Sequence, residues 1–453
     1  MNLGVVILAA GQGTRMKSSL PKVLHRLAGK PLLGHVIDCA RSLSPAEIVV
    51  VYGHGGDRVQ AAFEGQDDLQ WVEQAQQLGT GHAVQQAMPV LKSSDQVLVL
   101  YGDVPLTRSE TLAALIEATR HQGFGLLTVK LPNPSGYGRI VRNDGGRVQR
   151  IVEQKDATPE ELAIDEVNTG IMCLPRDRLV TWLAGLSNSN AQGEYYLTDV
   201  LAMAVADGFD IQVCQPAAAV EAEGVNDRAQ LARLERAHQQ RVADRLMADG
   251  VTLSDPTRLD VRGELQHGQD CEIDINVLIE GLVKLGNRVR IGANCVLRDM
   301  VVGDDVEILE NCVLEQAHIG NASKVGPFAR LRPGADLVGG AHVGNFVEIK
   351  KSVVGLGSKV NHLTYIGDSE IGEGVNIGAG TITCNYDGAN KHKTIIGDRA
   401  FIGSNSALVA PVTIGANATI GAGSVIGKDA PEDKLTLTRA KQVSLNWQRP
   451  TKK

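Results

Sequence analysis

Glycine and basic residues gather after the first apolar segment of the chain. The segment "VVILAAGQGTRM" (residues 5–16) begins as a continuous apolar run and passes through Gly11 to Arg15, and Lys22 follows shortly after. Glycine lets backbone N–H groups approach an anion closely, and the two cations could neutralise its charge. The spacing matches neither the P-loop nor the dinucleotide-binding pattern. The segment predicts an anion site, with a tight turn carrying two surface cations as the alternative.

A carboxylate follows another apolar segment. In "VLVLYGDVPL" (residues 97–106), Asp103 comes directly after the apolar run. Open parallel sheets collect ligands at the carboxyl ends of their strands, and Mg²⁺ takes one or two protein oxygens together with substrate phosphates. We therefore expect Asp103 to ligate Mg²⁺; capping of a helix is the structural alternative.

A third group of polar residues lies in the second half of the chain. The segment "TCNYDGANKHKT" (residues 383–394) interrupts a regular repeat, and Arg332, Lys350 and His362 precede it. Insertions in repeat proteins often build binding sites, although they can also be decoration. We expect this segment to leave the repeat as a loop beside a second site.

The elements that must position the first group alternate between strands and helices. Apolar strands spaced by helices are typical of a mostly parallel sheet covered on both faces. We expect strands at residues 4–10, 48–52, 96–101 and 125–130, and helices at residues 32–43 and 109–121.

A long helix is predicted between the two halves. Residues 226–250, "NDRAQLARLERAHQQRVADRLMADG", contain no internal proline or glycine and are rich in helix formers. Asn226 or Asp227 could cap its start and Gly250 could end it. We interpret it as a connection between domains; a partner-binding helix is the alternative. The predicted domains are residues 1–228 and 251–453, joined by residues 229–250.

The second half repeats with a period of six. Aliphatic residues recur at this spacing through residues 319–377 with two one-residue slips, and again through residues 396–426. This is the pattern of hexapeptide repeats, in which each repeat forms a short strand and a sharp corner. With three repeats to a coil and about 4.8 Å between coils, roughly ten coils would form a prism about 45 Å long.

Composition excludes several classes of protein. The net charge of −7 and the scattered basic residues of the 453-residue chain argue against nucleic-acid binding. No stretch has the apolar length of a membrane span. The seven cysteines include no C-x-x-C pair and are expected to be reduced, in a cytoplasmic protein.

The motifs resemble those of the sugar-nucleotide pyrophosphorylases. The first segment with Lys22 is close to their pattern, and the match continues through "EQAQQLGTGHA", "YGDVPL", "GYGRI", "IVEQKDA", "EVNTGI" and "EGVN". With the repeats, the resemblance covers nearly the whole chain and points to the bacterial bifunctional N-acetylglucosamine-1-phosphate uridyltransferase and glucosamine-1-phosphate acetyltransferase. It implies an α/β domain with a Rossmann-like, mostly parallel sheet, followed by a left-handed parallel β-helix.

The resemblance implies a set of residues for uridyl transfer. Its nucleophile is a phosphate oxygen that is already ionised, so the protein must chiefly overcome repulsion between two anions with Mg²⁺, Arg15 and Lys22. By resemblance, Asp103 and Asn226 would ligate Mg²⁺. The residues implied to bind UTP or the UDP-sugar are Leu8, Ala9, Ala10, Gly11, Lys22, Gln74, Gly79, Thr80, Tyr101, Gly102, Asp103, Gly138, Glu153, Asn168 and Asn226.

The resemblance implies a second set for acetyl transfer. An amine must lose a proton before it attacks a thioester, and His362 is the candidate base because histidine is the side chain that most readily exchanges a proton near neutral pH. A backbone N–H near Ala379 could stabilise the oxyanion. By resemblance, the amino-sugar phosphate is bound by Arg332, Lys350, Tyr365 and Asn376, and acetyl-CoA by Ala379, Asn385, Tyr386, Ser404, Ala422 and Arg439.

The resemblance also implies a homotrimer with shared acetyl sites, and a product that feeds cell-envelope polysaccharide synthesis. One rival interpretation makes the prism only an assembly or regulatory module. A second makes the whole chain a non-catalytic scaffold. A third, a three-histidine zinc site, is disfavoured because His342 and His362 occupy different positions within their hexapeptides and His392 lies in the interruption.

Overall fold

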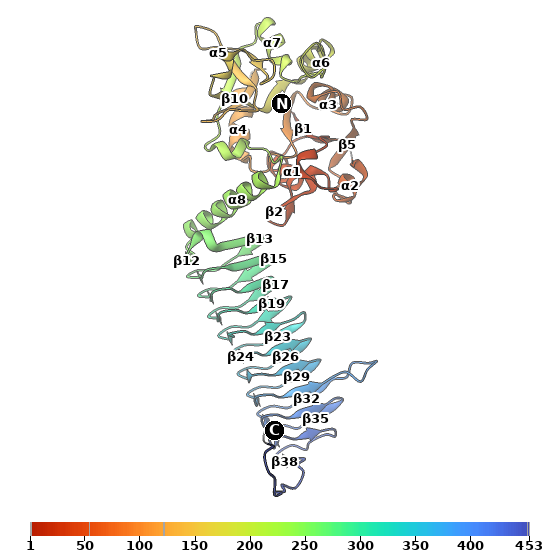
Figure 1. Ribbon diagram of the computed structural model, residues 1–453, viewed down its shortest axis with the longest axis vertical. Helices are drawn as coiled ribbons and strands as arrows, with labels where there is room; N and C mark the ends of the chain where they lie inside the picture. The colour runs from red at the N-terminus through yellow and green to blue at the C-terminus, as the bar shows by residue number, and fades with distance from the viewer. Residues whose placement is uncertain (1, 54, 121–122, 451, 453) are drawn as a thin grey trace. The chain divides into compact units, whose positions relative to one another are not determined.

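The computed structural model describes residues 2–53, 55–120, 123–450 and 452, and the chain forms two compact units, Met1–His238 and Gln239–Lys453. Figure 1 shows the sheet and helices of the first unit and the stacked strands of the second. No helix in the described part of the chain has the length and apolarity to cross a membrane.

The first unit is built on one mixed sheet. Its strand order is β11-β7-β10-β6-β1-β4-β5. β1 is parallel to both neighbours, whereas β10 is antiparallel to β6 and β7. The strands are β1 (Leu3–Ala9), β4 (Glu47–Tyr52), β5 (Leu69–Glu73), β6 (Gln96–Tyr101), β7 (Phe124–Lys130), β10 (Glu166–Pro175) and β11 (Ile211–Cys214), with β8 (Arg139–Arg142) and β9 (Val148–Val152) beside β10 and a small pair β2 (Arg26–Leu27) and β3 (Lys30–Pro31) apart from it.

Helices cover both faces of this sheet, and each face has its own hydrophobic core. Side chains of α3, α6 and α7 bury one face, and those of α1, α2 and α4 bury the other. The helices are α1 (Leu32–Ser42), α2 (Gly56–Ala61), α3 (Thr80–Ala87), α4 (Ser109–Ala118), α5 (Pro159–Leu162), α6 (Arg176–Ala184) and α7 (Asp199–Ala206).

The predicted α/β class is confirmed, and the expected strands and helices are present within one to three residues at their ends. The helix expected at residues 109–121 ends at Ala118, and residue 121 lies outside the described residues.

The predicted long helix is α8 (Arg228–Ala248). The Asp227 carboxylate accepts the Gln230 N–H at 2.8 Å, which caps its start, and Gly250 follows its end with φ +98°. Leu234 belongs to a core cluster of the first unit, whereas Leu246 is part of the core of the second. The boundary between the compact units therefore falls within this helix.

The second unit is a solenoid of parallel strands, as the hexapeptide period predicts. On one face, Val343 lies beside Val360 of the next rung. Ile377 lies beside Ile402 of its next rung, although the chain between these two residues is longer because it contains the interruption. The strands of this face are β12 (Thr252–Leu253), β14 (Glu272–Ile273), β16 (Arg290–Ile291), β18 (Glu307–Ile308), β21 (Lys324–Val325), β24 (His342–Asn345), β27 (Lys359–His362), β30 (Asn376–Ile377), β33 (Phe401–Ile402), β36 (Thr419–Ile420) and β38 (Leu435–Thr436).

The remaining strands form two further ladders that join through three longer strands near the start of the solenoid. The second ladder contains β19 (Val313–Glu315), β22 (Arg330–Leu331), β25 (Glu348–Lys350), β28 (Tyr365–Gly367), β31 (Ile382–Cys384), β34 (Ala407–Val409) and β37 (Val425–Ile426). The third contains β20 (His318–Ile319), β23 (Ala335–Leu337), β26 (Ser352–Val354), β29 (Ser369–Ile371), β32 (Thr394–Ile396) and β35 (Val412–Ile414). The joining strands are β13 (Leu259–Gln266), β15 (Val277–Leu285) and β17 (Val296–Val302).

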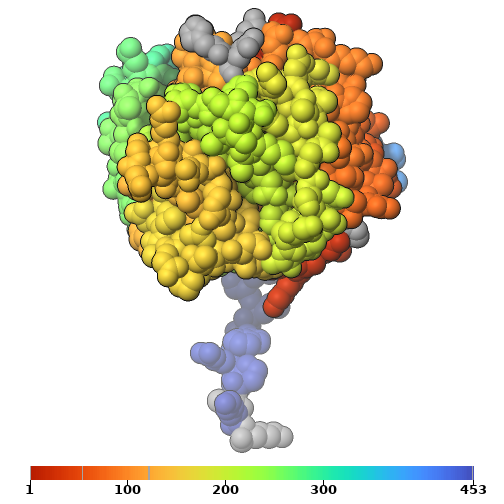
Figure 2. All heavy atoms as spheres, turned by 90° about the horizontal axis from the view of Figure 1, so that it is seen from above, coloured from red at the N-terminus to blue at the C-terminus, as the bar shows by residue number. Residues whose placement is uncertain are grey.

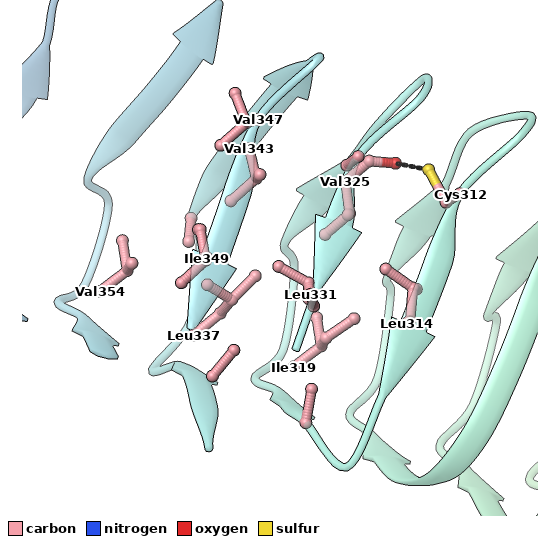
Figure 3. Close-up of a cluster of buried hydrophobic side chains, with 14 of the residues drawn as sticks. Cys312, Leu314, Ile319, Val325, Leu331, Leu337, Val343, Val347, Ile349 and Val354 are labelled. Atoms are coloured by element: carbon pink, nitrogen blue, oxygen red, sulfur yellow. Dashed lines mark hydrogen bonds between the residues drawn. The ribbon is translucent and has the colours of Figure 1, made fainter. Parts of the chain in front are cut away.

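Aliphatic side chains fill the solenoid. Figure 3 shows Leu331, Val343 and Ile349 pointing inward from β22, β24 and β25, and each is fully buried. The aliphatic positions that set the period of six are all no more than 3% exposed. Stacking of similar side chains leaves little room for aromatic rings, which accounts for an aromatic content of only 4%.

One corner of the solenoid carries residues in the left-handed backbone region on every rung. Asn276, Asn294 and Asn311 occupy it on the early rungs with φ of 59°, 60° and 62°. Asparagine tolerates this conformation better than most residues do. Phe328 and Phe346 take the same place on later rungs, with φ of 56°. Their rings stack with 5.2 Å between centroids and stay about half exposed.

Candidate active sites

The first candidate site begins where β1 ends. After the buried strand, the chain turns through Gly11 and Gly13 into a short 3-10 helix, Thr14–Met16. A Cβ on Gly11 would meet nothing within 4 Å, so this part of the loop is open. Gly13 has φ +62°, and a Cβ there would lie 2.6 Å from the Lys22 Cβ. Glycine at position 13 is therefore required by the close approach of the Lys22 segment.

Lys22 joins two oxygen-bearing side chains from distant parts of the chain. Its ammonium forms an ion pair with the Asp103 carboxylate and lies 3.4 Å from the Asn226 Oδ1. The Val225 N–H donates to the Asp103 carbonyl at 2.8 Å, which holds the residue before Asn226 beside the end of β6. The side chains of Lys22 and Asp103 are 13% and 16% exposed. The Asp103 carboxylate and the Asn226 amide oxygen thus face the same point, which the Lys22 ammonium occupies.

This donor set fits Mg²⁺. A carboxylate oxygen and an amide oxygen are ligands that Mg²⁺ uses, and it completes its shell with water and substrate phosphates. Among the described residues, no group of three or more histidine, cysteine, aspartate or glutamate side chains is placed to hold a metal.

A cavity of about 270 Å³ lies beside these residues. Predicted residues that line it are Leu8, Ala9, Ala10, Gly11, Lys22, Gln74, Gly79, Thr80, Tyr101 and Asp103. Sequence analysis missed Val23, Gln77, Ala83 and Glu194, which also line it. The "EQAQQLGTGHA" motif contained Gln77 and Ala83 but gave no reason to select them. Arg15 is exposed in the 3-10 helix and does not line the cavity, and Gly102 lies beside it, donating its N–H to the Leu8 carbonyl at 2.9 Å.

At one end of the cavity, the start of α3 packs against residues near 195. The Gly81 N–H donates to the Tyr195 carbonyl at 2.8 Å, and Thr80 Oγ1 accepts the Leu197 N–H at 3.1 Å. Gly79 has φ +111°, and a Cβ there would lie 2.6 Å from the Tyr195 carbonyl oxygen. These contacts hold Gly79 and Thr80 in place at the cavity wall. Figure 2 shows this unit from above, where segments that are far apart in the sequence pack against one another.

Three further residues from the set implied to bind UTP or the UDP-sugar lie together. The Asn168 N–H donates to the Gly138 carbonyl at 2.9 Å. A Cβ on Gly138 would lie 3.3 Å from the Glu153 carboxylate, which accepts a hydrogen bond from Thr198 at 3.2 Å. Burial raises the pKa of Glu153, despite that hydrogen bond. Burial also raises the pKa of Tyr101, a cavity residue that the charge of Glu153 affects in the same direction.

The second candidate site lies on the solenoid around His362. Its Nδ1 is 2.7 Å from the Asn345 Oδ1 on the neighbouring rung, where β24 pairs with β27. An amide oxygen only accepts hydrogen bonds, so Nδ1 carries the hydrogen and Nε2 keeps a lone pair. The imidazole is exposed, and its free nitrogen is the one that could take a proton.

Basic side chains lie on successive rungs of the second ladder. β25, which ends at Lys350, pairs with β22 and with β28, where Tyr365 lies beside Glu348. Arg332 donates to the Glu348 carboxylate at 2.8 Å, and this hydrogen bond raises the pKa of Arg332. The predicted phosphate-binding residues are therefore stacked within a few rungs of His362.

The predicted loop leaves the solenoid over a shorter range than expected. Residues 383 and 384 still belong to β31 and residue 394 begins β32, because their backbones pair with neighbouring rungs. Asn385 is buried and donates to the Asp368 carboxylate. The Tyr386 ring is exposed and lies 5.0 Å from the Lys391 ammonium.

The predicted acetyl-CoA residues follow a column of glycines. A Cβ on Gly378 would lie 2.5 Å from the Ser404 N, and one on Gly403 would lie 2.4 Å from the Ala422 N. Ala379, Ser404 and Ala422 each come directly after such a glycine on consecutive rungs, and Asn376 comes two residues before the first. The Arg439 side chain reaches this column, and a Cβ on Gly421 would lie 2.8 Å from its Nη2.

Comparison with known proteins identifies the family. A family model described as a MobA-like NTP transferase domain matches residues 5–152, and one described as bacterial transferase hexapeptide (six repeats) matches residues 393–428. "Bifunctional protein GlmU" from two strains of Acinetobacter baumannii is 58% identical over the whole of this chain and 99% of each relative. The protein of the same name from Ralstonia nicotianae is 58% identical over 99% of both chains.

The chain belongs to the bifunctional GlmU family. The resemblance drawn from the motifs is thereby confirmed, and it extends over the full length. As a GlmU protein, the chain is a bifunctional transferase with a nucleotidyltransferase unit and a hexapeptide-repeat acetyltransferase unit.

Membership of the GlmU family does not test the role of each residue toward its ligand. The structure brings most of the predicted nucleotide-site residues to one cavity and stacks the acetyl-site residues on neighbouring rungs. Their individual ligand contacts stay predictions.

Proposed function

We propose that this protein acetylates glucosamine-1-phosphate with acetyl-CoA and then joins the N-acetylglucosamine-1-phosphate to UTP, releasing pyrophosphate. The observation that carries the proposal is the presence of two different polar assemblies: Lys22 between Asp103 and Asn226 at a cavity, and His362 held by Asn345 on the solenoid. We assign the first reaction to residues 251–453 and the second to residues 1–228, with residues 229–250 joining them.

For uridyl transfer, the chain has to bring two anionic substrates together. The open backbone at Gly11 leaves room for phosphate oxygens, and Lys22 offsets their charge. Arg15, exposed just beyond the glycine loop, is proposed to contact the triphosphate from outside the cavity lining. The Glu153 carboxylate is proposed to accept hydrogen bonds from the sugar, and the Asn168 amide to donate a hydrogen bond to it. No side chain needs to remove a proton, because the attacking phosphate oxygen is ionised at neutral pH.

Asp103 and Asn226 are proposed to hold Mg²⁺. When bound, the ion would neutralise charge that develops on the phosphate oxygens during transfer. The support for this role is the pair of oxygen donors that converge on the Lys22 ammonium. The proposal also requires Lys22 to be close enough to contact the same phosphates.

For acetyl transfer, His362 is proposed as the general base. Asn345 fixes the imidazole so that Nε2 can accept a proton from the substrate amine as the amine attacks the thioester carbon. Arg332 and Lys350 are proposed to bind the sugar phosphate, and the N–H groups near Ala379 to stabilise the oxyanion. Tyr386 and Arg439, both exposed, are proposed to contact acetyl-CoA.

A homotrimer with shared acetyl sites is proposed as the functional assembly. Phe328 and Phe346 support it, because they are half exposed at a corner where earlier rungs carry asparagine. Burial against a second copy of the chain would account for bulky apolar residues in a left-handed conformation. We further propose a cytoplasmic location, where acetyl-CoA and UTP are available, and a role of the product in cell-envelope polysaccharide synthesis. Among the described residues, the seven cysteines form no disulfide, which agrees with a reducing compartment.

The test uses the full-length protein and two separate readouts. Acetyl-CoA with glucosamine-1-phosphate should release free thiol, and UTP with N-acetylglucosamine-1-phosphate and Mg²⁺ should release pyrophosphate. Acetyl-CoA, glucosamine-1-phosphate and UTP supplied together with Mg²⁺, without N-acetylglucosamine-1-phosphate, should still yield UDP-N-acetylglucosamine. Thiol release without pyrophosphate release, or the reverse, would contradict the bifunctional assignment. Absence of thiol release alone would favour the solenoid as an assembly module.

A further inference from the structure

Gln74 is the buried polar side chain whose orientation decides what the cavity offers a ligand. It is 4% exposed and lines the cavity beside Gly79 and Thr80. Its Nε2 donates to the Gly79 carbonyl at 3.0 Å and lies 3.1 Å from the His82 Nδ1. Both hydrogens of the carboxamide nitrogen are therefore used within the protein, provided that His82 Nδ1 is an acceptor.

His82 is held by a second contact on its other side. Its Nε2 lies 3.1 Å from the Gln86 Nε2, one helical turn further along α3. A neutral imidazole accepts at only one ring nitrogen, so one of the two carboxamides must turn its oxygen toward the ring. The Gly79 carbonyl holds the Gln74 nitrogen in place, so Gln86 is the carboxamide that turns, and its oxygen accepts the Nε2–H. The neutral imidazole then carries its hydrogen on Nε2, and Nδ1 keeps a lone pair for Gln74. The chain Gln86–His82–Gln74 thus has one consistent arrangement of donors and acceptors.

This arrangement leaves only the carboxamide oxygen of Gln74 for a ligand. Among the described residues, no donor is hydrogen-bonded to the Gln74 Oε1. A hydrogen-bond acceptor at the cavity wall pairs with a base that presents an N–H at ring position 3, as uracil does. Cytosine presents a lone pair at that position, so two acceptors would face each other.

We infer that His82 is a positioning residue that sets base selectivity by fixing the carboxamide of Gln74 with its oxygen toward the nucleotide. The inference rests on the proposed uridyl transfer and adds the residue that makes the site reject cytosine. Without an acceptor at Nδ1, one hydrogen of the carboxamide nitrogen loses its partner, and only the Gly79 carbonyl still holds the oxygen toward the nucleotide. The turned-over carboxamide, which presents its N–H₂ group and suits cytosine, then becomes more accessible.

The test compares UTP with CTP as substrate for the full-length protein. His82→Leu should lower the ratio of kcat/KM for UTP to that for CTP by about tenfold or more, since an unpaired buried polar group costs about 1–3 kcal/mol. His82→Asn, whose amide oxygen can stand near the Nδ1 position, should restore most of the ratio. Gln85→Leu, an exposed neighbour on α3, should leave the ratio unchanged.

Thermal unfolding of the first unit, compared with that of the unmodified protein, reports whether each variant is folded. A folded His82→Leu variant with an unchanged UTP to CTP ratio would overturn the inference. A low ratio in His82→Asn equal to that of His82→Leu would also overturn it, because the acceptor would then not matter. Lack of pyrophosphate release by the unmodified protein with UTP would instead contradict the proposed function.

Discussion

At the scale of single residues, the first site depends on one ion pair. The Lys22 ammonium contacts the Asp103 carboxylate and lies near the Asn226 amide oxygen, and most of the Lys22 and Asp103 side chains is shielded from solvent. A carboxylate and an ammonium in such a setting each depend on the other for compensation of charge. Removal of the negative charge should therefore affect both the position of Lys22 and the capacity to hold Mg²⁺.

Asp103→Asn keeps the shape of the side chain and removes its charge. We expect it to lower pyrophosphate release from UTP and N-acetylglucosamine-1-phosphate by at least about a hundredfold, the scale of losing one electrostatic contact to the reacting groups. Thiol release from acetyl-CoA by the same preparation should stay normal. Near-normal pyrophosphate release would contradict the metal assignment.

His362→Asn tests the second site in the same way. The variant lacks a group that can take up a proton near neutral pH, so acetyl transfer should fall by about 10²–10⁴-fold while uridyl transfer is retained. His318→Asn serves as the matched control, because His318 is an exposed histidine on another ladder, bonded to Asp336. Equal loss in both variants would indicate a structural effect, and retained activity in His362→Asn would require a different base.

At the scale of elements, the glycine loop after β1 places Lys22 by close approach. The left-handed backbone at Gly13 brings the loop against the Lys22 stem, whereas Gly11 faces open space. Two glycines two residues apart therefore have different physical roles.

Gly13→Ala should lower the free energy of unfolding of the first unit by about 1–2 kcal/mol, from the cost of a left-handed alanine, and should also displace Lys22. Gly11→Ala should leave stability unchanged, since its Cβ meets nothing. Thermal unfolding monitored in the two variants distinguishes them. Equal melting temperatures would show that the Lys22 segment moves to accommodate the extra carbon.

Much of this architecture was predictable from the sequence because its rules are local. A period of six in aliphatic residues is enough to predict stacked rungs, since each rung buries the same kind of side chain. The break in that period likewise located the loop, to within two residues at its start.

The convergence of Lys22 with Asp103 and Asn226 was not predictable from spacing, because 81 and 204 residues separate them. Only resemblance to a family suggested it. Gln77 and Glu194 were missed for a related reason, because their place at the cavity follows from tertiary contacts. Gln77 donates to the Ala10 carbonyl, and Glu194 adjoins Tyr195, which packs against the start of α3. The period of six did not predict that Phe328 and Phe346 lie half-exposed at one corner of the solenoid, because this place depends on the left-handed backbone there.

At the scale of the whole molecule, the acetyl sites are proposed to need three copies of the chain. Phe328→Asn combined with Phe346→Asn places at this corner the residue that earlier rungs carry, so the solenoid should fold. Sedimentation velocity should report a trimer for the unmodified protein and smaller species for the variant. Acetyl transfer should fall together with assembly, and uridyl transfer should persist.

Val353→Asn, at a partly exposed position on a different ladder, is the control and should leave assembly intact. A double variant that remains trimeric would move the proposed interface away from this corner. A protein that is monomeric before any substitution would contradict the shared sites altogether.

The helix α8 limits how the gene could be divided. A cut after codon 228 would strip Leu234 from the hydrophobic cluster it completes, and a start at codon 251 would uncover the first rungs by discarding Leu246. Each fragment would then expose an apolar surface and tend to aggregate. Two fragments that each keep their own part of the hydrophobic core therefore require a division within the helix, near residue 238.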